Sequence, residues 1–141
     1  MRYICLKWKP ELIGRSLQER AEIDMMGAVI NDLKVAGVMI PCYVHGDREK
    51  IEEDCKKRLE PIVKWLGDKK FLMGNNICYL DFILFECTNV IEFVSEGRVW
   101  TDYPILKPYN ERIRAIPELA DAIKKAEAKA FNNPFAKLNN K

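Results

Sequence analysis

The stretch that most restricts the fold is Tyr79 to Val94, YLDFILFECTNVIEFV, because apolar residues fall on almost every face of the helix that it predicts. Such a helix must be covered on all sides, so it belongs at the centre of a helical bundle. No segment alternates convincingly with the two-residue period of a strand. The sequence therefore predicts an all-α fold, with roughly five helices packed around a buried central helix at Tyr79–Val94.

The start of this central helix carries specific end signals. Asp81 stands at the third helical position, where its carboxylate can accept a hydrogen bond from the backbone of the N-cap residue, Cys78. Ile77 and Phe82 have the spacing of a hydrophobic staple. A thiol is a weak acceptor compared with the Ser or Thr hydroxyl that usually occupies an N-cap. We therefore expect the Cys78 half of this capping box to be the weaker half.

A first long helix is predicted upstream. Ser16 and Glu19 form a capping box, and the helix that they begin can run to about Tyr43. One stripe of this helix is polar or small, and its other faces are apolar. We therefore expect it to be buried on more than one side.

A second helix is predicted from Gly46-Asp47 to Leu66, with Gly67 as its stop signal. Pro61 lies inside it and removes one backbone donor, which predicts a bend. Three acid-first pairs, Glu52–Lys56, Glu53–Lys57 and Asp54–Arg58, predict a solvated face. Two further helices are predicted over residues 104–115 and 117–130, followed by an aperiodic tail whose two aromatic residues could fold back onto the body.

Charge and cysteine content exclude several classes of protein. The 23 basic and 21 acidic residues nearly cancel, so we expect neither a nucleic-acid partner nor an anionic-membrane partner, and no apolar run is long enough for a membrane span. Five scattered cysteines without a Cys-x-x-Cys pair favour free thiols in a reducing intracellular compartment, with the cytoplasm preferred and mitochondria as the alternative. Cys5 is expected to be the most accessible of them. The single histidine, His45, has no metal-ligating neighbour in sequence and is expected in a surface turn, so no metal site is predicted.

Five motifs, in order along nearly the whole chain, resemble the C-terminal helical domain of the cytosolic glutathione transferases, and most closely the mu class. They are RYICLKW, SLQERAEIDM, RLEPIVKWLGDKKFLMGNNICYLDF, YPILKPYNERIRAIPELADAI and NPFAKLNNK. The resemblance implies that residues 1–10 are the remnant of the last helix of a thioredoxin-like domain with its linker. It implies that residues 11–141 form the helical domain and that the thioredoxin-like domain itself is absent from the chain.

The same resemblance assigns roles to individual residues. Tyr43 matches a tyrosine whose hydroxyl faces the electrophilic substrate, and Phe135 lies in the tail that lines the same pocket. Asp32 matches an aspartate that reaches glutathione bound by the partner subunit. Ala136 replaces a polar tail residue of mu enzymes, which weakens the case for an intact pocket. For each of Tyr43 and Asp32, an ordinary structural role is the alternative interpretation.

Three functions remain open on the sequence. The first is a non-catalytic structural or protein-interaction module, with a protein partner or a homodimer covering the surface of the missing domain. The second is part of an active mu-type transferase, either a fragment or half of a split enzyme, which would conjugate glutathione to hydrophobic electrophiles. Glutathione would then be a co-substrate only if another chain supplied a thioredoxin-like domain. The third is a carrier of hydrophobic ligands.

Overall fold

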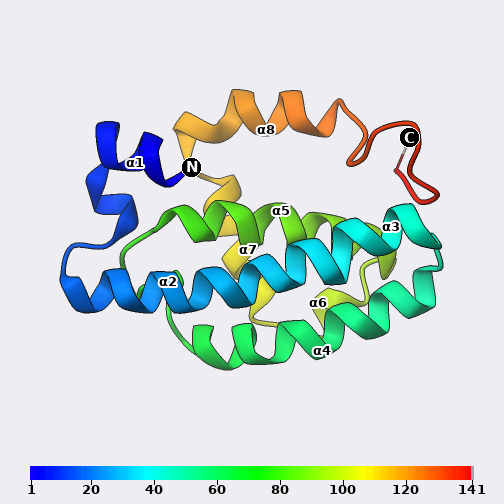
Figure 1. The fold of residues 1–141 in the computed structure, drawn as a ribbon, viewed down its shortest axis with the longest axis horizontal. Coiled ribbons are helices and arrows are strands. Elements are labelled where there is room, and N and C mark those ends of the chain that lie inside the picture. The colour runs from blue at the N-terminus through cyan, green and yellow to red at the C-terminus, as the bar shows by residue number, and fades with distance from the viewer. Residues whose placement is uncertain (141) are drawn as a thin grey trace.

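The computed structural model describes residues 1–140, and over this range the chain forms helices and no β-strand. The prediction of an all-α fold is therefore confirmed. The α-helices of Figure 1 are α1 (Arg2–Trp8), α2 (Leu17–Asp32), α3 (Ile40–Val44), α4 (Arg48–Leu66), α5 (Tyr79–Val94), α6 (Val99–Asp102), α7 (Leu106–Arg114) and α8 (Ala120–Glu127). Short 3-10 helices occupy Pro10–Ile13 and Pro117–Leu119, and a π-helical segment occupies Leu33–Met39.

Helices α2, α4 and α5 pack against one another, and α7 covers the far side of α5 (Figure 1). Helix α5 has the predicted bounds, and nine of its sixteen residues are buried, on more than one face of the helix. The core residues of α5 meet Ile30 and Leu33 from the first long helix and Leu59 and Ile62 from α4. The near-continuous apolar character of Tyr79–Val94 thus places this helix at the centre, as expected.

The predicted single helix from Ser16 to about Tyr43 is interrupted. Residues Leu33–Met39 are π-helical, and α3 follows as a separate short element. Within the π segment Gly37 lies against α4, where its carbonyl accepts a bond from the Cys55 thiol at 3.2 Å. A Cβ atom at Gly37 would lie 3.1 Å from Cδ of Arg58. This close contact between helices arises from tertiary packing, which the periodicity of the sequence does not encode.

The two capping boxes form with one difference. The Ser16 hydroxyl accepts from the Glu19 backbone N–H at 3.1 Å, as predicted. The Glu19 carboxylate, however, accepts from the backbone N–H of Arg15 at 2.7 Å instead of that of Ser16. At α5 the Asp81 carboxylate accepts from the Cys78 backbone N–H at 2.7 Å. The hydrogen bond predicted between Asp81 and the N-cap backbone is therefore present.

Asp81 also joins parts of the chain that are distant in sequence. Its side chain has 0% exposure, and it accepts hydrogen bonds from the Leu72 backbone N–H at 2.9 Å and from the Tyr109 hydroxyl at 2.8 Å. Burial raises the pKa of Tyr109, so this hydroxyl stays protonated and donates a hydrogen bond to the carboxylate. Asp81 thereby ties α5 to the preceding turn and to α7.

The structure tests the predicted Ile77–Phe82 staple and the predicted bend at Pro61 only in part. Phe82 packs against the core, whereas the staple contact between Ile77 and Phe82 stays a prediction. Helix α4 runs through Pro61 without interruption, and the predicted bend there stays a prediction as well.

All five cysteines are buried and free. Cys5 in α1 is the most exposed of them, as expected, although only 6% of it is accessible. One expectation about exposure was wrong: Glu52 is buried instead of solvated, because the Arg98 guanidinium from beyond α5 folds over it in an ion pair. Arg98 is distant from Glu52 in sequence, so the helix pattern did not reveal this partner.

Candidate functional site

A pocket of about 1060 Å³ lies between α5 and α8. Its walls come from three parts of the chain: the end of the first long helix, one face of α5, and α8 with the tail. The apolar lining residues are Val38, Met39, Tyr43, Phe82, Phe85, Val90, Phe93, Leu119, Ala122, Ile123, Ala126 and Phe131. Helix α8 runs over α5 in Figure 1, and the pocket occupies the space that it encloses.

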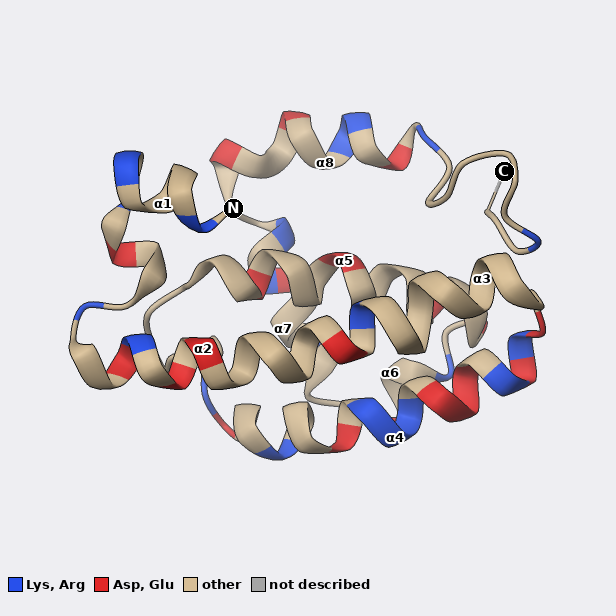
Figure 2. Ribbon diagram, in the orientation of Figure 1, with Lys and Arg blue, Asp and Glu red and all other residues tan. Residues whose placement is uncertain are grey.

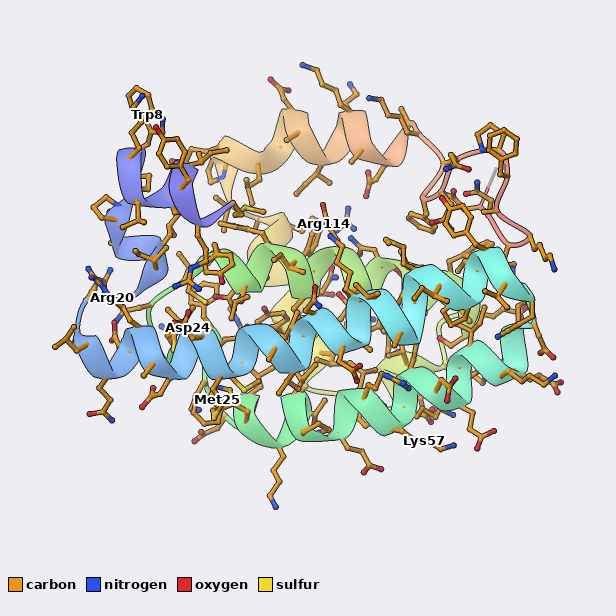
Figure 3. All side chains as sticks on the ribbon, viewed as in Figure 1. Trp8, Arg20, Asp24, Met25, Lys57 and Arg114 are labelled. Carbon is orange, nitrogen blue, oxygen red and sulfur yellow. The ribbon has the colours of Figure 1, made fainter. Side chains whose placement is uncertain are left out.

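The rim of the pocket is polar. Lys34 forms an ion pair with Glu86 at 3.3 Å. Arg114 points from the end of α7 toward α8 in Figure 3, where it pairs with Glu127. Its guanidinium carbon lies 5.4 Å from the centre of the Phe85 ring, within the range of a cation–π contact. An apolar interior with a few charged groups at its edge is the usual composition of a site for a largely apolar small molecule.

Tyr43 lies at the end of the pocket where the tail crosses it. The Tyr43 hydroxyl accepts a hydrogen bond from the backbone N–H of Asn133 at 3.2 Å. Beside it, the Cys42 carbonyl accepts from the N–H groups of Lys137 and Leu138 at 2.9 and 3.1 Å. The tail, residues 131–140, is therefore fastened across α3 as a strap.

Asparagine side chains hold the strap in its folded shape. Asn132 donates from its side-chain amide to the Leu138 carbonyl at 3.1 Å, and Asn139 donates to the Asn132 carbonyl at 2.8 Å. Phe131 at the beginning of the strap meets Phe93 of α5 edge to face, with ring centres 5.8 Å apart. The strap thus closes one end of the pocket with an aromatic contact and a set of local hydrogen bonds.

The ionisable groups in the pocket do not include an activated thiol. Cys87 lines the pocket, but burial raises its pKa to about 12, so the thiol is neutral near pH 7. Within residues 1–140, no three His, Cys, Asp or Glu side chains are placed to hold a metal ion. The lining is suited to an apolar group, and Tyr43 is among the residues that form it.

A family model described as "Glutathione S-transferase, C-terminal domain" matches residues 32–126. This chain belongs to the glutathione S-transferase family. The match runs from the end of α2 to the end of α8 and so includes the central helix and most of the pocket.

Several curated glutathione S-transferases resemble the chain over most of its length. A glutathione S-transferase from Dermatophagoides pteronyssinus is 32% identical over 99% of this chain and 63% of that protein. The class-mu 26 kDa isozyme 7 of Fasciola hepatica is 30% identical over 88% of this chain and 56% of that protein. The chain thus spans about three fifths of the length of these relatives, and they include members of the mu class.

The fold agrees with a solved structure of the same family. The pi-class glutathione S-transferase of Onchocerca volvulus superposes with a TM-score of 0.82, at 22% identity, over 96% of this chain and 67% of that one. At 22% sequence identity, this similarity establishes a shared fold and nothing further. None of the helices within residues 1–140 is both long and apolar enough to cross a membrane.

The structure separates the site residues that the glutathione transferase resemblance grouped together. Tyr43 lines the pocket, but Asp32 lies on the side facing α4, where it accepts from Nε of Arg58 at 3.0 Å. Phe135 is 89% exposed and points away from the pocket lining, and Ala136 is half-buried in the strap. The roles of Tyr43, Asp32 and Phe135 toward substrate or glutathione stay predictions.

Sequence reasoning missed other residues of the pocket between α5 and α8. Phe131 is the tail aromatic that contacts α5, and Arg114 and Lys34 supply its charged rim. The sequence could not show which of Phe131 and Phe135 lines the pocket, because the tail has no periodic pattern. In the sequence, Lys34 is one residue of the polar stripe of the first long helix, and nothing there places it at a pocket.

Proposed function

We propose that this chain acts as a glutathione transferase-type helical domain in a protein-interaction role, without conjugating glutathione by itself. The observation that carries this proposal is the surface of α1. Tyr3, Ile4, Leu6 and Trp8 are 54–74% exposed, whereas Cys5 is the one buried residue of this helix. Exposed apolar side chains gathered on one element are typical of a surface that another protein covers.

A sizing experiment in an extract of the organism that makes the protein tests this role. We expect the tagged wild-type chain to elute in an assembly well above 16.4 kDa. The variant Ile4→Gln/Trp8→Gln should shift to the size of the free chain. The matched control is Leu17→Gln/Phe135→Gln, which removes two even more exposed apolar side chains outside α1 and should leave the assembly intact. A wild-type chain that elutes as a free monomer contradicts the proposal.

A second candidate function is supported by the pocket between α5 and α8. Its apolar walls and the Tyr43 hydroxyl suit an apolar ligand, either carried unchanged or presented as an electrophile to glutathione held by a thioredoxin-like domain. Anilinonaphthalene sulfonate is a suitable fluorescent probe. Its binding should be lost in Val90→Glu, which places a charge in the pocket, and retained in Val44→Glu, which alters an exposed valine outside it.

A conjugation assay separates the carrier from the enzyme. Glutathione and a chlorodinitrobenzene electrophile are supplied to the native assembly, and the rate is compared with that of the assembly containing Tyr43→Phe. Turnover that falls in this variant supports the enzyme and contradicts the non-catalytic role. Probe binding without turnover supports the carrier.

A further inference from the structure

The contact between α5 and α7 contains two buried polar side chains among apolar ones. Thr88 has 0% exposure and Asn110 has 5%. The Asn110 amide donates to the Thr88 hydroxyl at 3.0 Å, and that hydroxyl donates to the Phe85 carbonyl at 2.9 Å. Burying polar groups costs stability unless their hydrogen bonds are made, and two apolar side chains would fill the same contact without that cost. The polar pair therefore calls for a reason other than packing.

The Asn110 amide also reaches the wall of the pocket between α5 and α8. It donates to the side-chain oxygen of Asn89 at 3.1 Å, and the same oxygen accepts from Nη2 of Arg114 at 3.4 Å. Asn89 and Arg114 both line the pocket. The buried polar pair is thus connected, through one amide oxygen, to a positive charge at the pocket wall. Figure 2 shows α7 and α8 carrying charges of both signs, so the direction of this one guanidinium matters more than the net charge.

The Arg114 guanidinium is held from three directions. Asn89 accepts from one terminal nitrogen, Glu127 of α8 pairs with the other, and the Phe85 ring centre lies 5.4 Å from the guanidinium carbon. Lys34, which also lines the pocket, is instead a point charge on a flexible stem. A guanidinium that is already oriented loses less entropy on binding an anion than such a lysine does.

Of these three contacts, the ion pair with Glu127 is the one that a ligand can replace. The Glu127 side chain is 55% exposed, and ion pairs so open to solvent contribute little to stability. A carboxylate carried into the pocket on an apolar body is less exposed to water, which strengthens its attraction to the guanidinium. Its two oxygen atoms also match two parallel N–H groups of an arginine.

We infer that Arg114 is the specificity-determining residue of this pocket and selects an apolar ligand that ends in a carboxylate, with Asn110 and Asn89 as positioning residues. The inference rests on ligand binding in the pocket, the second of the proposed functions, and names the class of ligand. The carboxylate takes the place of Glu127 at the guanidinium. The apolar body of the ligand lies among the aromatic and aliphatic side chains of the lining.

A matched pair of fluorescent ligands tests the inference on the full chain. Dansylaminoundecanoic acid and its primary amide share one apolar body, and only the acid is charged near pH 7. Fluorescence titration gives a Kd for each ligand with the wild type and with Arg114→Met, Arg114→Lys and Asn110→Leu. Lys125→Met is the control, because it removes an exposed cation of α8 that does not line the pocket.

The wild type should bind the acid about tenfold more tightly than the amide, or better, as expected for hydrogen bonds to a charged group. Arg114→Met should abolish this preference while leaving the Kd of the amide unchanged. Arg114→Lys keeps the charge without the paired geometry and should give an intermediate preference. Asn110→Leu should lower the preference without changing the Kd of the amide, a separation that a general loss of stability would not produce. Lys125→Met should behave as the wild type.

Each contrary result has a distinct meaning. Equal affinity of the wild type for acid and amide overturns the inference but leaves ligand binding in the pocket standing. A preference that survives Arg114→Met overturns the assignment to Arg114, and one that is unchanged in Asn110→Leu overturns the positioning role. Failure of the wild type to bind either ligand contradicts both the inference and the proposed ligand binding.

Discussion

The Tyr43 hydroxyl accepts a hydrogen bond from the backbone N–H of Asn133, which lies 90 residues further along the chain, at 3.2 Å. This bond fastens the tail strap across the end of the pocket between α5 and α8. The hydroxyl still has a proton of its own that it can donate to a ligand. Tyr43 therefore has a structural role that does not depend on whether it also contacts substrate.

We predict that Tyr43→Phe loosens the strap. Removing the hydroxyl leaves the Asn133 N–H without its partner, at a cost of about 1 kcal/mol because the group is exposed enough to be hydrated. Hydrogen exchange should accelerate over residues 131–140, while α4 and α5 keep their protection. Tyr3→Phe is the control, since the exposed Tyr3 belongs to α1, at the opposite end of the molecule from the strap in Figure 1. Unchanged exchange in the tail would refute the strap.

A second prediction concerns the start of the central helix. Cys78→Ser should stabilise the protein by about 0.5–1 kcal/mol, because a hydroxyl is a better N-cap acceptor than a thiol. Thermal unfolding of the two proteins measures this difference. Cys87→Ser is the comparison, since it places a hydroxyl in the core away from any helix start and should be destabilising. An unchanged or lower Tm for Cys78→Ser counts against the cap.

The buried contact between Asp81 and Tyr109 leads to a third prediction. Asp81→Ala leaves the buried backbone N–H groups of Leu72 and Cys78 unpaired, each costing about 1–3 kcal/mol, and leaves the Tyr109 hydroxyl only its 3.4 Å bond to the Asp81 carbonyl, so the loss should exceed about 2 kcal/mol. Tyr109→Phe removes the hydroxyl itself, so it leaves no buried donor without a partner. This change should cost about 1–2 kcal/mol. Urea unfolding of both variants and of the double variant gives the coupling energy. Equal costs for the two single changes would mean that Asp81 does not hold all three groups.

The ion pairs of Glu52 give a pH-dependent prediction. Hydrogen bonding from Arg98 is the main cause that lowers the pKa of Glu52 from its ordinary value of 4.5, and Lys56 at 3.0 Å adds to it. The carboxylate therefore stabilises the folded state fully above pH 4.5, and this contribution is lost as the pH falls through the lower folded-state value.

Glu52→Gln should accordingly destabilise the protein by about 1.5–3 kcal/mol at pH 7, the range for hydrogen bonds to charged groups. The difference from wild type should shrink steadily as urea unfolding is repeated from pH 6 down to pH 3. Glu53→Gln is the control, because the Glu53–Lys57 pair is fully exposed and solvent screening leaves it little effect on stability. A cost of Glu52→Gln that is the same at every pH would contradict the ion-pair explanation.

Local sequence patterns determined the helices and most of their ends. The bounds of α5, the Asp81 cap, the Ser16 cap and the stop of α4 at Gly67 all depend on residues within four positions of one another. Helix periodicity and capping act over that range, so one sequence suffices to predict them. The motifs that resembled the glutathione transferase helical domain were drawn from the same segments, and the family match over residues 32–126 agrees with them.

Only the tertiary structure shows the pocket, the burial of Glu52 and the π-helical segment. The pocket exists because α8 and the strap return over α5, and whether Phe131 or Phe135 contacts α5 depends on that return. The burial of Glu52 depends on Arg98, which is 46 residues away, and the π-helical segment depends on the approach of α4 to Gly37. Contacts between residues so distant in sequence are fixed by helix packing, and the apolar period of a helix predicts which face is buried but not which residues cover it.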